Sequence, residues 1–234
     1  MTEGIGKALA SAIKDGNEPV SGKHTGLIFQ NQHRRDIFTS LTLNPCAGLS
    51  DIASRCRISP NTAEWHLGVL INAGYVVKST AGRRRVFFPE GLITHEQAAL
   101  FRVINNPSSG LLLRTVINKP GLSQTELAEE LGKTRQWIAG AMTELVALGA
   151  VSILSDGSLQ RHYPTRLLPE KAEDFYRQSK DFADYLVRKL SAEGGKNPLV
   201  VKRNPGRVVI EIGPATGRFS FEVGVNPYLT CLSC

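Results

Sequence analysis

Residues 59–76 read Ser-Pro-Asn-Thr-Ala-Glu-Trp-His-Leu-Gly-Val-Leu-Ile-Asn-Ala-Gly-Tyr-Val. Apolar residues recur in this stretch at the three- and four-residue spacing of one helix face, which predicts an amphipathic helix. Ser59 suits the N-cap of that helix, and Pro60 suits its first position, where a missing N–H leaves no intrahelical partner unpaired. Gly74 suits a left-handed cap at the other end. The expected apolar stripe consists of Ala63, Leu67, Leu70 and Ile71.

The segments on either side of this helix complete a small unit. Before it, the sequence predicts a helix over Arg34–Leu43 and a short helix that Ser50 caps and that runs to about Arg57. After it, Tyr75–Thr80 and Arg83–Phe88 alternate in polarity like the two strands of a hairpin. Helix, helix, turn, helix and hairpin is the order of elements in a winged helix-turn-helix unit.

The same pattern recurs further along the chain, because residues 37–89 align with residues 112–164 without a gap. The second copy predicts helices at 111–118, 125–131 and 134–148 and strands at 151–154 and 159–163. The predicted fold class is therefore α+β, mainly α, with two consecutive winged helix-turn-helix domains at residues 30–92 and 100–168. The identities fall on turn, core and strand-end residues: Pro45 and Pro120, Ala53 and Ala128, Leu70 and Leu145, Gly74 and Gly149, Val76 and Val151, Gly82 and Gly157, Pro89 and Pro164.

The remaining segments predict additions to these two units. Residues 169–194 predict one long helix with apolar residues at heptad-like positions, which either joins two chains in a homodimer or lies across the second winged unit of its own chain. Residues 199–234 predict a small antiparallel β extension with strands at 199–202, 207–212 and 218–225. Residues 1–29 predict a short helix and a linker.

The N-terminal end of the third helix in each copy carries the side chains expected to contact DNA. A helix in the major groove turns the residues of its N-terminal end toward the base edges. The alternative for Ser59 and Thr134 is that they only cap their helices, and the alternative for His66 is that it packs against the preceding helix. The candidate residues are Ser59, Asn61, Thr62, Trp65 and His66 in the first copy and Thr134, Arg135 and Gln136 in the second.

The hairpin of the first copy is strongly basic, with Lys78, Arg83, Arg84 and Arg85. Beside a groove these cations would reach phosphates or a narrow minor groove; alternatively they form a charged edge that discourages aggregation. The chain carries a net charge of +7, and residues 30–89 hold eight Lys or Arg against three acids. Residues 100–166 hold seven against five. The first copy should therefore dominate the attraction of phosphate.

Residues 61–76 resemble the recognition helix and first wing strand of ArsR-like winged-helix regulators. The residues that carry this resemblance are the pair His66-Leu67 and the ending Ala73-Gly74-Tyr75-Val76. Residues 122–128, 134–136 and 145–151 resemble the MarR side of the same superfamily. The tandem arrangement is similar to that of a group of archaeal regulators, and the likeness covers about residues 30–166. Metal-sensing ArsR-like repressors carry paired cysteines before the recognition helix, where this chain has only Cys56. The resemblance therefore implies DNA binding without metal sensing at that place.

These patterns lead us to expect a transcription regulator that binds double-stranded DNA without a cofactor. The alternatives are a winged-helix scaffold that docks proteins, and a thiol or metal sensor using Cys231 and Cys234, which stand at C-x-x-C spacing without a second ligand pair. The sequence holds no phosphate-binding glycine loop and no hydrolase or metalloprotease motif, so we do not expect an enzyme. No run of about 18 apolar residues and no signal-peptide core is present, so we expect a cytoplasmic protein without a membrane partner.

Overall fold

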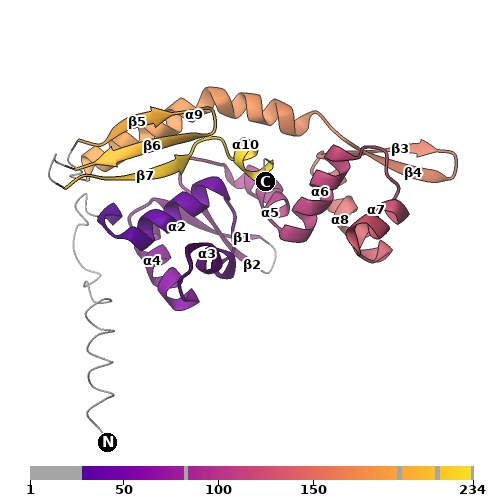
Figure 1. The fold of residues 1–234 in the computed structure, drawn as a ribbon, viewed down its shortest axis with the longest axis horizontal. Helices are drawn as coiled ribbons and strands as arrows, with labels where there is room; N and C mark the ends of the chain where they lie inside the picture. The colour runs from indigo at the N-terminus through magenta and orange to yellow at the C-terminus, as the bar shows by residue number, and fades with distance from the viewer. Residues whose placement is uncertain (1–27, 82–83, 194–196, 214–216, 233–234) are drawn as a thin grey trace, which may run out of the picture.

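This computed structural model describes residues 28–81, 84–193, 197–213 and 217–232. Of the helix and linker expected over residues 1–29, only Ile28 and Phe29 fall within them, in the 3-10 turn η1 (Ile28–Gln30). The described chain is mainly helical with three small antiparallel sheets (Figure 1). This agrees with the mixed, mainly α class expected from the sequence. None of the helices within the described residues is long and apolar enough to cross a bilayer.

The first unit contains three helices and a hairpin. They are α2 (Gln32–Leu43), α3 (Leu49–Cys56), α4 (Pro60–Asn72), β1 (Val76–Ala81) and β2 (Arg84–Pro89). These bounds agree with the sequence-based ones to within about two residues, the usual uncertainty of helix ends. At α4 the expected signals act as predicted, because the Ser59 side chain accepts the backbone N–H of Thr62 and Gly74 has a φ of 69°. The expected cap of α3 was wrong, since Gly48 rather than Ser50 is its N-cap and donates its backbone N–H to Asp51. A bridge between Ala47 and Phe87 adds a third short strand to the hairpin.

The second unit repeats this order of elements. It consists of α6 (Pro107–Asn118), α7 (Gln124–Leu131), α8 (Arg135–Ala147), β3 (Val151–Asp156) and β4 (Leu159–Pro164). The strand register repeats as well, since Val76 opposite Pro89 corresponds to Val151 opposite Pro164. A bridge between Leu122 and His162 adds a short third strand at the same position as in the first unit.

Helix α5 (His95–Ile104) connects the two units and is absent from our sequence-based expectations. Thr94 and Gln97 form a capping box at its start, in which each side chain pairs with the backbone N–H of the other residue. The Asn105 side chain, at its end, donates to the carbonyl of Pro45 in the first unit. Helix α5 is therefore attached to the first unit before the chain enters α6.

The long helix α9 (Leu167–Ala192) forms as predicted, and it lies within its own chain, although mostly against elements other than the second unit. Its apolar face is buried within its own chain, along the first unit and the C-terminal sheet rather than across the second unit (Figure 1). At its end, the Tyr75 hydroxyl donates to Glu193 over 2.6 Å. The face expected to join two chains is therefore covered. Its buried residues are Leu168, Phe175, Phe182, Ala183, Leu186 and Leu190.

The C-terminal sheet contains the three predicted strands in the order β5 (Leu199–Arg203), β6 (Arg207–Ile212) and β7 (Phe219–Gly224). It packs on α2, where the Thr39 hydroxyl donates to the carbonyl of Glu222 over 2.6 Å and the Gly224 N–H donates to the Thr42 hydroxyl over 2.9 Å. Only glycine fits at 224, because a Cβ there would lie 2.6 Å from the carbonyl oxygen of Thr42. The sheet is thus part of the first unit's core.

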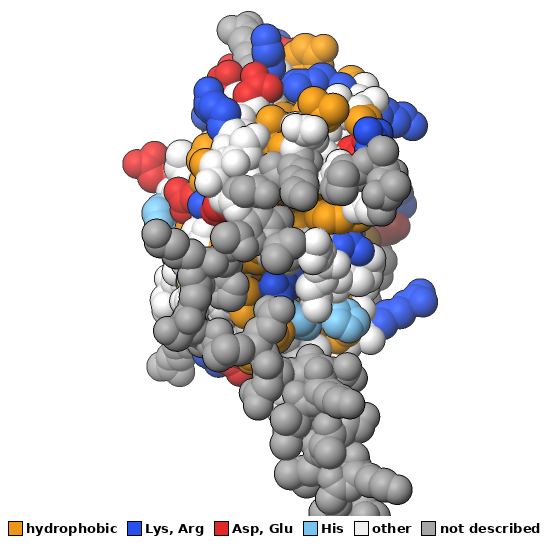
Figure 2. Space-filling model, turned by 90° about the vertical axis from the view of Figure 1, so that its left-hand side faces the viewer, with side chains coloured by type: hydrophobic (Ala, Val, Ile, Leu, Met, Phe, Trp, Pro, Cys, Tyr) orange, Lys and Arg blue, Asp and Glu red, His pale blue; other side chains and the backbone are white. Residues whose placement is uncertain are grey.

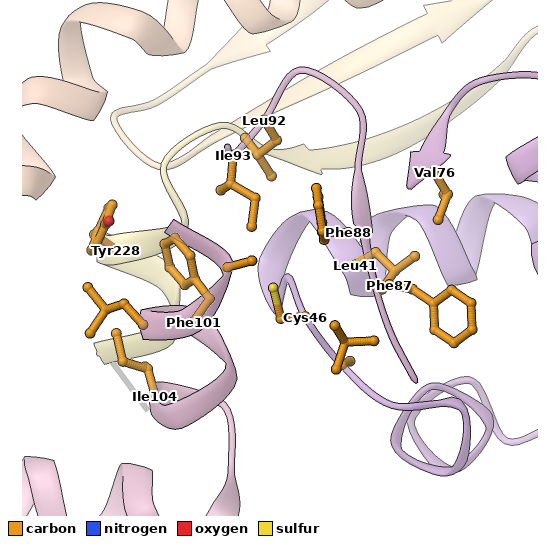
Figure 3. Close-up of a cluster of buried hydrophobic side chains, with 14 of the residues drawn as sticks. Leu41, Cys46, Val76, Phe87, Phe88, Leu92, Ile93, Phe101, Ile104 and Tyr228 are labelled. Carbon is orange, nitrogen blue, oxygen red and sulfur yellow. The ribbon is translucent and has the colours of Figure 1, made fainter. Parts of the chain in front are cut away.

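A short helix, α10 (Pro227–Leu232), ends the described chain, where the sequence had predicted a continued β extension. Pro227 cannot donate to a strand ladder and suits the first turn of a helix. The Asn226 side chain donates to the carbonyl of Ala172 over 2.8 Å, which fixes the start of α10 on α9. The centre of the Tyr228 ring lies 4.6 Å from that of Phe101 in α5, and Figure 3 shows the two side chains next to each other.

Candidate nucleic-acid interface

The N-terminal turn of α4 exposes part of the predicted set. Ser59 and Asn61 are exposed, while Thr62 is half-buried. The Ser59 and Thr62 hydroxyls lie 2.8 Å apart, and Ser59 also caps the helix. The capping role proposed for Ser59 is therefore present. Asn61 has no hydrogen-bond partner within the described residues. In this turn it is therefore the side chain that can meet an approaching base without losing another contact.

His66 does not belong to this exposed surface, which corrects one member of the predicted set. Only 4% of it is exposed, and its ring packs 5.4 Å from that of His33 and 4.7 Å from that of Trp65. Burial, aided by the charges of Arg34 and His33, lowers the pKa of His66 to about 4. The imidazole is thus neutral and part of the core, although the ring contacts come from α2 and α4 rather than from the preceding helix α3. The sequence favoured neither burial nor DNA contact for His66, because its position in the helix suits both the buried and the exposed face.

Trp65 is half-buried, and a buried cation packs against its ring. The Arg34 guanidinium lies 5.6 Å from the centre of its ring, within the range of a cation–π contact. Arg34 itself is buried at the start of α2. Trp65 therefore belongs partly to the packing between α2 and α4, and only its outer edge remains for a ligand.

The basic hairpin lies against the outer face of α4. Arg85 Nη1 is 3.2 Å from Glu64 Oε1, and both side chains are more than half exposed. Arg84 and Lys78 are exposed as well, whereas Arg83 lies outside the described residues. An exposed ion pair of this kind stabilises by less than about 1 kcal/mol, so Arg85 can exchange Glu64 for a phosphate at little cost. The ion pair places Arg85 and the exposed face of α4 on one surface.

The second unit has a similar helix but a different hairpin. Thr134 caps α8 through the backbone N–H of Trp137, and Arg135 and Gln136 are exposed. The ammonium of Lys133 lies 5.8 Å from the Trp137 ring, and we did not predict it as a site residue, although it directly precedes the cap. The hairpin exposes Ile153, Leu154 and Leu159, while its Arg161 is paired with Asp156 and Glu126.

The cysteines give no sign of a metal or redox site within the described residues. No three His, Cys, Asp or Glu side chains gather there at metal-binding spacing. Cys46 is buried, and burial raises the pKa of the half-buried Cys56 thiol to about 11, so the reactive thiolate is disfavoured. Cys234 and the side chain of Cys231 lie outside the description.

The end of the molecule next to the C-terminal sheet has a mixed surface. Figure 2 shows basic, acidic and apolar side chains interspersed over this end. Charges of alternating sign weaken each other's long-range attraction for a polyanion. This end therefore offers no uniformly basic surface to a polyanion.

One comparison with known proteins agrees with this description of the first unit. Residues 30–77, from η1 to the start of β1, match the family model described as winged helix-turn-helix DNA-binding. A comparison with curated protein sequences finds no match. A solved structure, the DIP2311 protein from Corynebacterium diphtheriae, is 15% identical with a TM-score of 0.23, over 58% of this chain and 27% of that one. The chain thus spans about a quarter of that protein's length. The matched segment is similar to winged helix-turn-helix units that bind DNA.

Proposed function

We propose that the chain is a transcription regulator that binds double-stranded DNA through the first unit, with α4 in the major groove and the β1–β2 hairpin on the backbone. The observation that carries this proposal is the 3.2 Å contact between Arg85 and Glu64, which joins the basic hairpin to the exposed side of α4. A protein-docking unit has no need of exposed arginines beside a polar helix end. A cytoplasmic location and the absence of enzymatic activity belong to the same proposal.

The proposal extends to the second unit as a further winged helix-turn-helix domain, of the MarR-like type beside an ArsR-like first unit. The matching strand registers and the capped start of α8 support this extension. Arg135 and Gln136 suit guanine and adenine edges. We do not propose a homodimer through α9, because its apolar face is already covered.

A salt series with a matched control variant tests DNA binding. Fluorescence anisotropy with duplex DNA would compare the wild type with Arg84→Ala/Arg85→Ala and with Lys202→Ala/Arg203→Ala, which removes the same charge from the exposed part of β5. We expect the logarithm of affinity to fall linearly with that of salt concentration. The wing variant should have a shallower slope by up to about two phosphate contacts, and the control should keep the wild-type slope.

Two outcomes would contradict the proposal. Unmeasurable binding at low salt would remove DNA as the partner. An equal loss in the wing variant and the control would attribute the affinity to net charge rather than to the hairpin.

The docking of a protein is the second candidate function, and the hairpin of the second unit favours it. Leu154 is 59% exposed and Leu159 46%, beside the partly exposed Ile153. Exposed apolar side chains on a projecting hairpin are typical of a protein contact. Leu154→Ser/Leu159→Ser should leave DNA affinity unchanged if this hairpin binds a protein. A loss of DNA affinity would assign the hairpin to DNA instead.

A further inference from the structure

A cavity of about 610 Å³ lies where the second unit meets the C-terminal helices, away from the surface described above. Helix α6 and the end of β4 form one wall, and the start of α9 and α10 form the other. Its volume lies within the range of small-molecule sites, roughly 300–1,000 Å³, and like them it is lined mainly by apolar groups. The lining includes Arg114, Ile117, Leu168, Pro169, Ala172 and Leu229.

The apolar lining is incompletely covered at the mouth of the cavity. Ile117 is 37% exposed and Leu229 is 40% exposed, although both border a concave surface. Leu111, one α-helical turn before Arg114 on the same side of α6, is 46% exposed. Covering these side chains with a hydrocarbon body would remove apolar area from water, which favours binding.

Arg114 supplies the charge at this cavity. It is half-buried on α6, and within the described residues it makes no ion pair. A guanidinium offers a planar pair of N–H donors that matches a carboxylate, and an apolar wall beside it strengthens that pairing. Among the described residues that line the cavity there is no Lys, Asp, Glu or second Arg. A ligand that matches this single positive charge carries one negative group.

We propose that this cavity binds a small apolar carboxylate, with its hydrocarbon body between α6, α9 and α10 and its carboxylate on Arg114. The inference stands on the cavity alone and does not depend on DNA binding. Its walls belong to the second unit on one side and, through α10 and Tyr228, to the body of the first unit on the other. An occupant would thus touch both parts of the molecule.

Isothermal titration calorimetry on the full chain tests the proposal with decanoate, 2-naphthoate and the uncharged 1-decanol as probes. We expect at least one of the two carboxylates to bind with a dissociation constant below about 1 mM, and 1-decanol to bind more weakly than decanoate. Arg114→Gln should weaken carboxylate binding about tenfold or more and leave 1-decanol unaffected, because it removes a charge-assisted hydrogen bond. Ala172→Phe, which fills the cavity, should weaken all three probes.

The control is Arg166→Gln, which removes an exposed cation close in sequence that does not line the cavity. It should bind the probes as the wild type does. The proposal is overturned if neither carboxylate binds to the wild type, or if Arg114→Gln and the wild type bind them equally. An equal loss in Arg166→Gln would also overturn it, because the attraction would then come from net charge. The comparison of decanoate with 1-decanol on the wild type stands even if a variant fails to fold.

Discussion

At the residue scale, the buried imidazole of His66 makes the stability of the first unit depend on pH. Its Nδ1 has no hydrogen-bond partner within the described residues, and its pKa is lowered to about 4, mainly by burial. In the unfolded chain a histidine has a pKa of about 6.5. The unfolded state therefore takes up a proton as the pH falls below about 6.5, while the folded state stays neutral until about pH 4. Folding stability is lost within that window and is fully present above it.

We predict that His66→Phe loses less stability than the wild type between pH 7 and pH 5. The aromatic ring keeps its packing against His33 and Trp65, but no group remains to protonate on unfolding. The difference should approach about 2 kcal/mol, since each unit of pKa shift corresponds to about 1.4 kcal/mol. Urea unfolding followed by circular dichroism at both pH values measures it. Parallel losses in the two proteins would show that His66 is already protonated in the folded state.

Two glycines with opposite surroundings give a second prediction at this scale. A Cβ at Gly224 would lie 2.6 Å from a backbone oxygen of α2, whereas a Cβ at Gly140 in α8 would meet nothing within 4 Å. Gly224→Ala should therefore lower the free energy of unfolding by about 1–3 kcal/mol, through overpacking between β7 and α2. Gly140→Ala should raise it by about 0.5–1 kcal/mol, because alanine favours a helix interior. Thermal denaturation compares the two, and a stable Gly224→Ala would mean that the sheet can move away from α2.

At the scale of elements, the start of α4 combines capping with the proposed DNA contact, and one substitution separates the two roles. Ser59→Asp retains a side-chain oxygen for the N–H of Thr62, so stability should stay within a few tenths of a kcal/mol. Its carboxylate would repel phosphate, so DNA affinity should fall about tenfold. Ser59→Ala should instead lower stability by about 1 kcal/mol. Unfolding experiments measure the stability of both variants, and anisotropy titrations measure their DNA affinity. Unchanged DNA affinity in Ser59→Asp would place this helix end away from DNA.

The elements differ in how far the sequence determined them. Each helix of the two units and the strands β1–β7 follow from periodicity and from caps such as Ser59, because these signals act within a few residues. Helix α5 carried a comparable signal in Thr94 and Gln97, which was overlooked between the two repeats. The position of α9 was beyond reach, since an apolar stripe shows that a face is buried but not against what.

In the candidate interface, too, only the features that depend on residues close in sequence could be predicted. The exposure of Asn61, Arg135 and Gln136 follows from their place at the starts of helices. The burial of His66 depends on α2, which brings His33 and the charge of Arg34 against it from another element. The pairing of Arg85 with Glu64 likewise depends on how the hairpin folds back onto α4. Contacts between elements distant in sequence were the part that periodicity could not supply.

At the scale of the whole molecule, the C-terminal part completes the first unit and leaves the second one less attached. The Phe221 ring of β7 stacks 4.9 Å from Phe29, and Tyr228 of α10 packs on α5. The second unit meets the rest of the chain at the α5–α6 junction and at the start of α9, with an ion pair from Arg102 to Glu144 across α5 and α8. The two units should therefore differ in their sensitivity to damage in the C-terminal sheet.

The two tryptophans allow this difference to be measured, because Trp65 lies in the first unit and Trp137 in the second. We predict that Phe221→Ala lowers the stability reported by Trp65 by about 3–5 kcal/mol, the usual cost of emptying a buried aromatic site. The transition reported by Trp137 should shift less, since its surroundings do not contain Phe221. Urea unfolding of Trp137→Phe and Trp65→Phe backgrounds separates the two signals. Leu145→Ala, in the core of the second unit, should show the reverse order. Equal shifts of both signals would mean that the units unfold together, and the cavity between them would then lie inside one cooperative structure rather than at a joint.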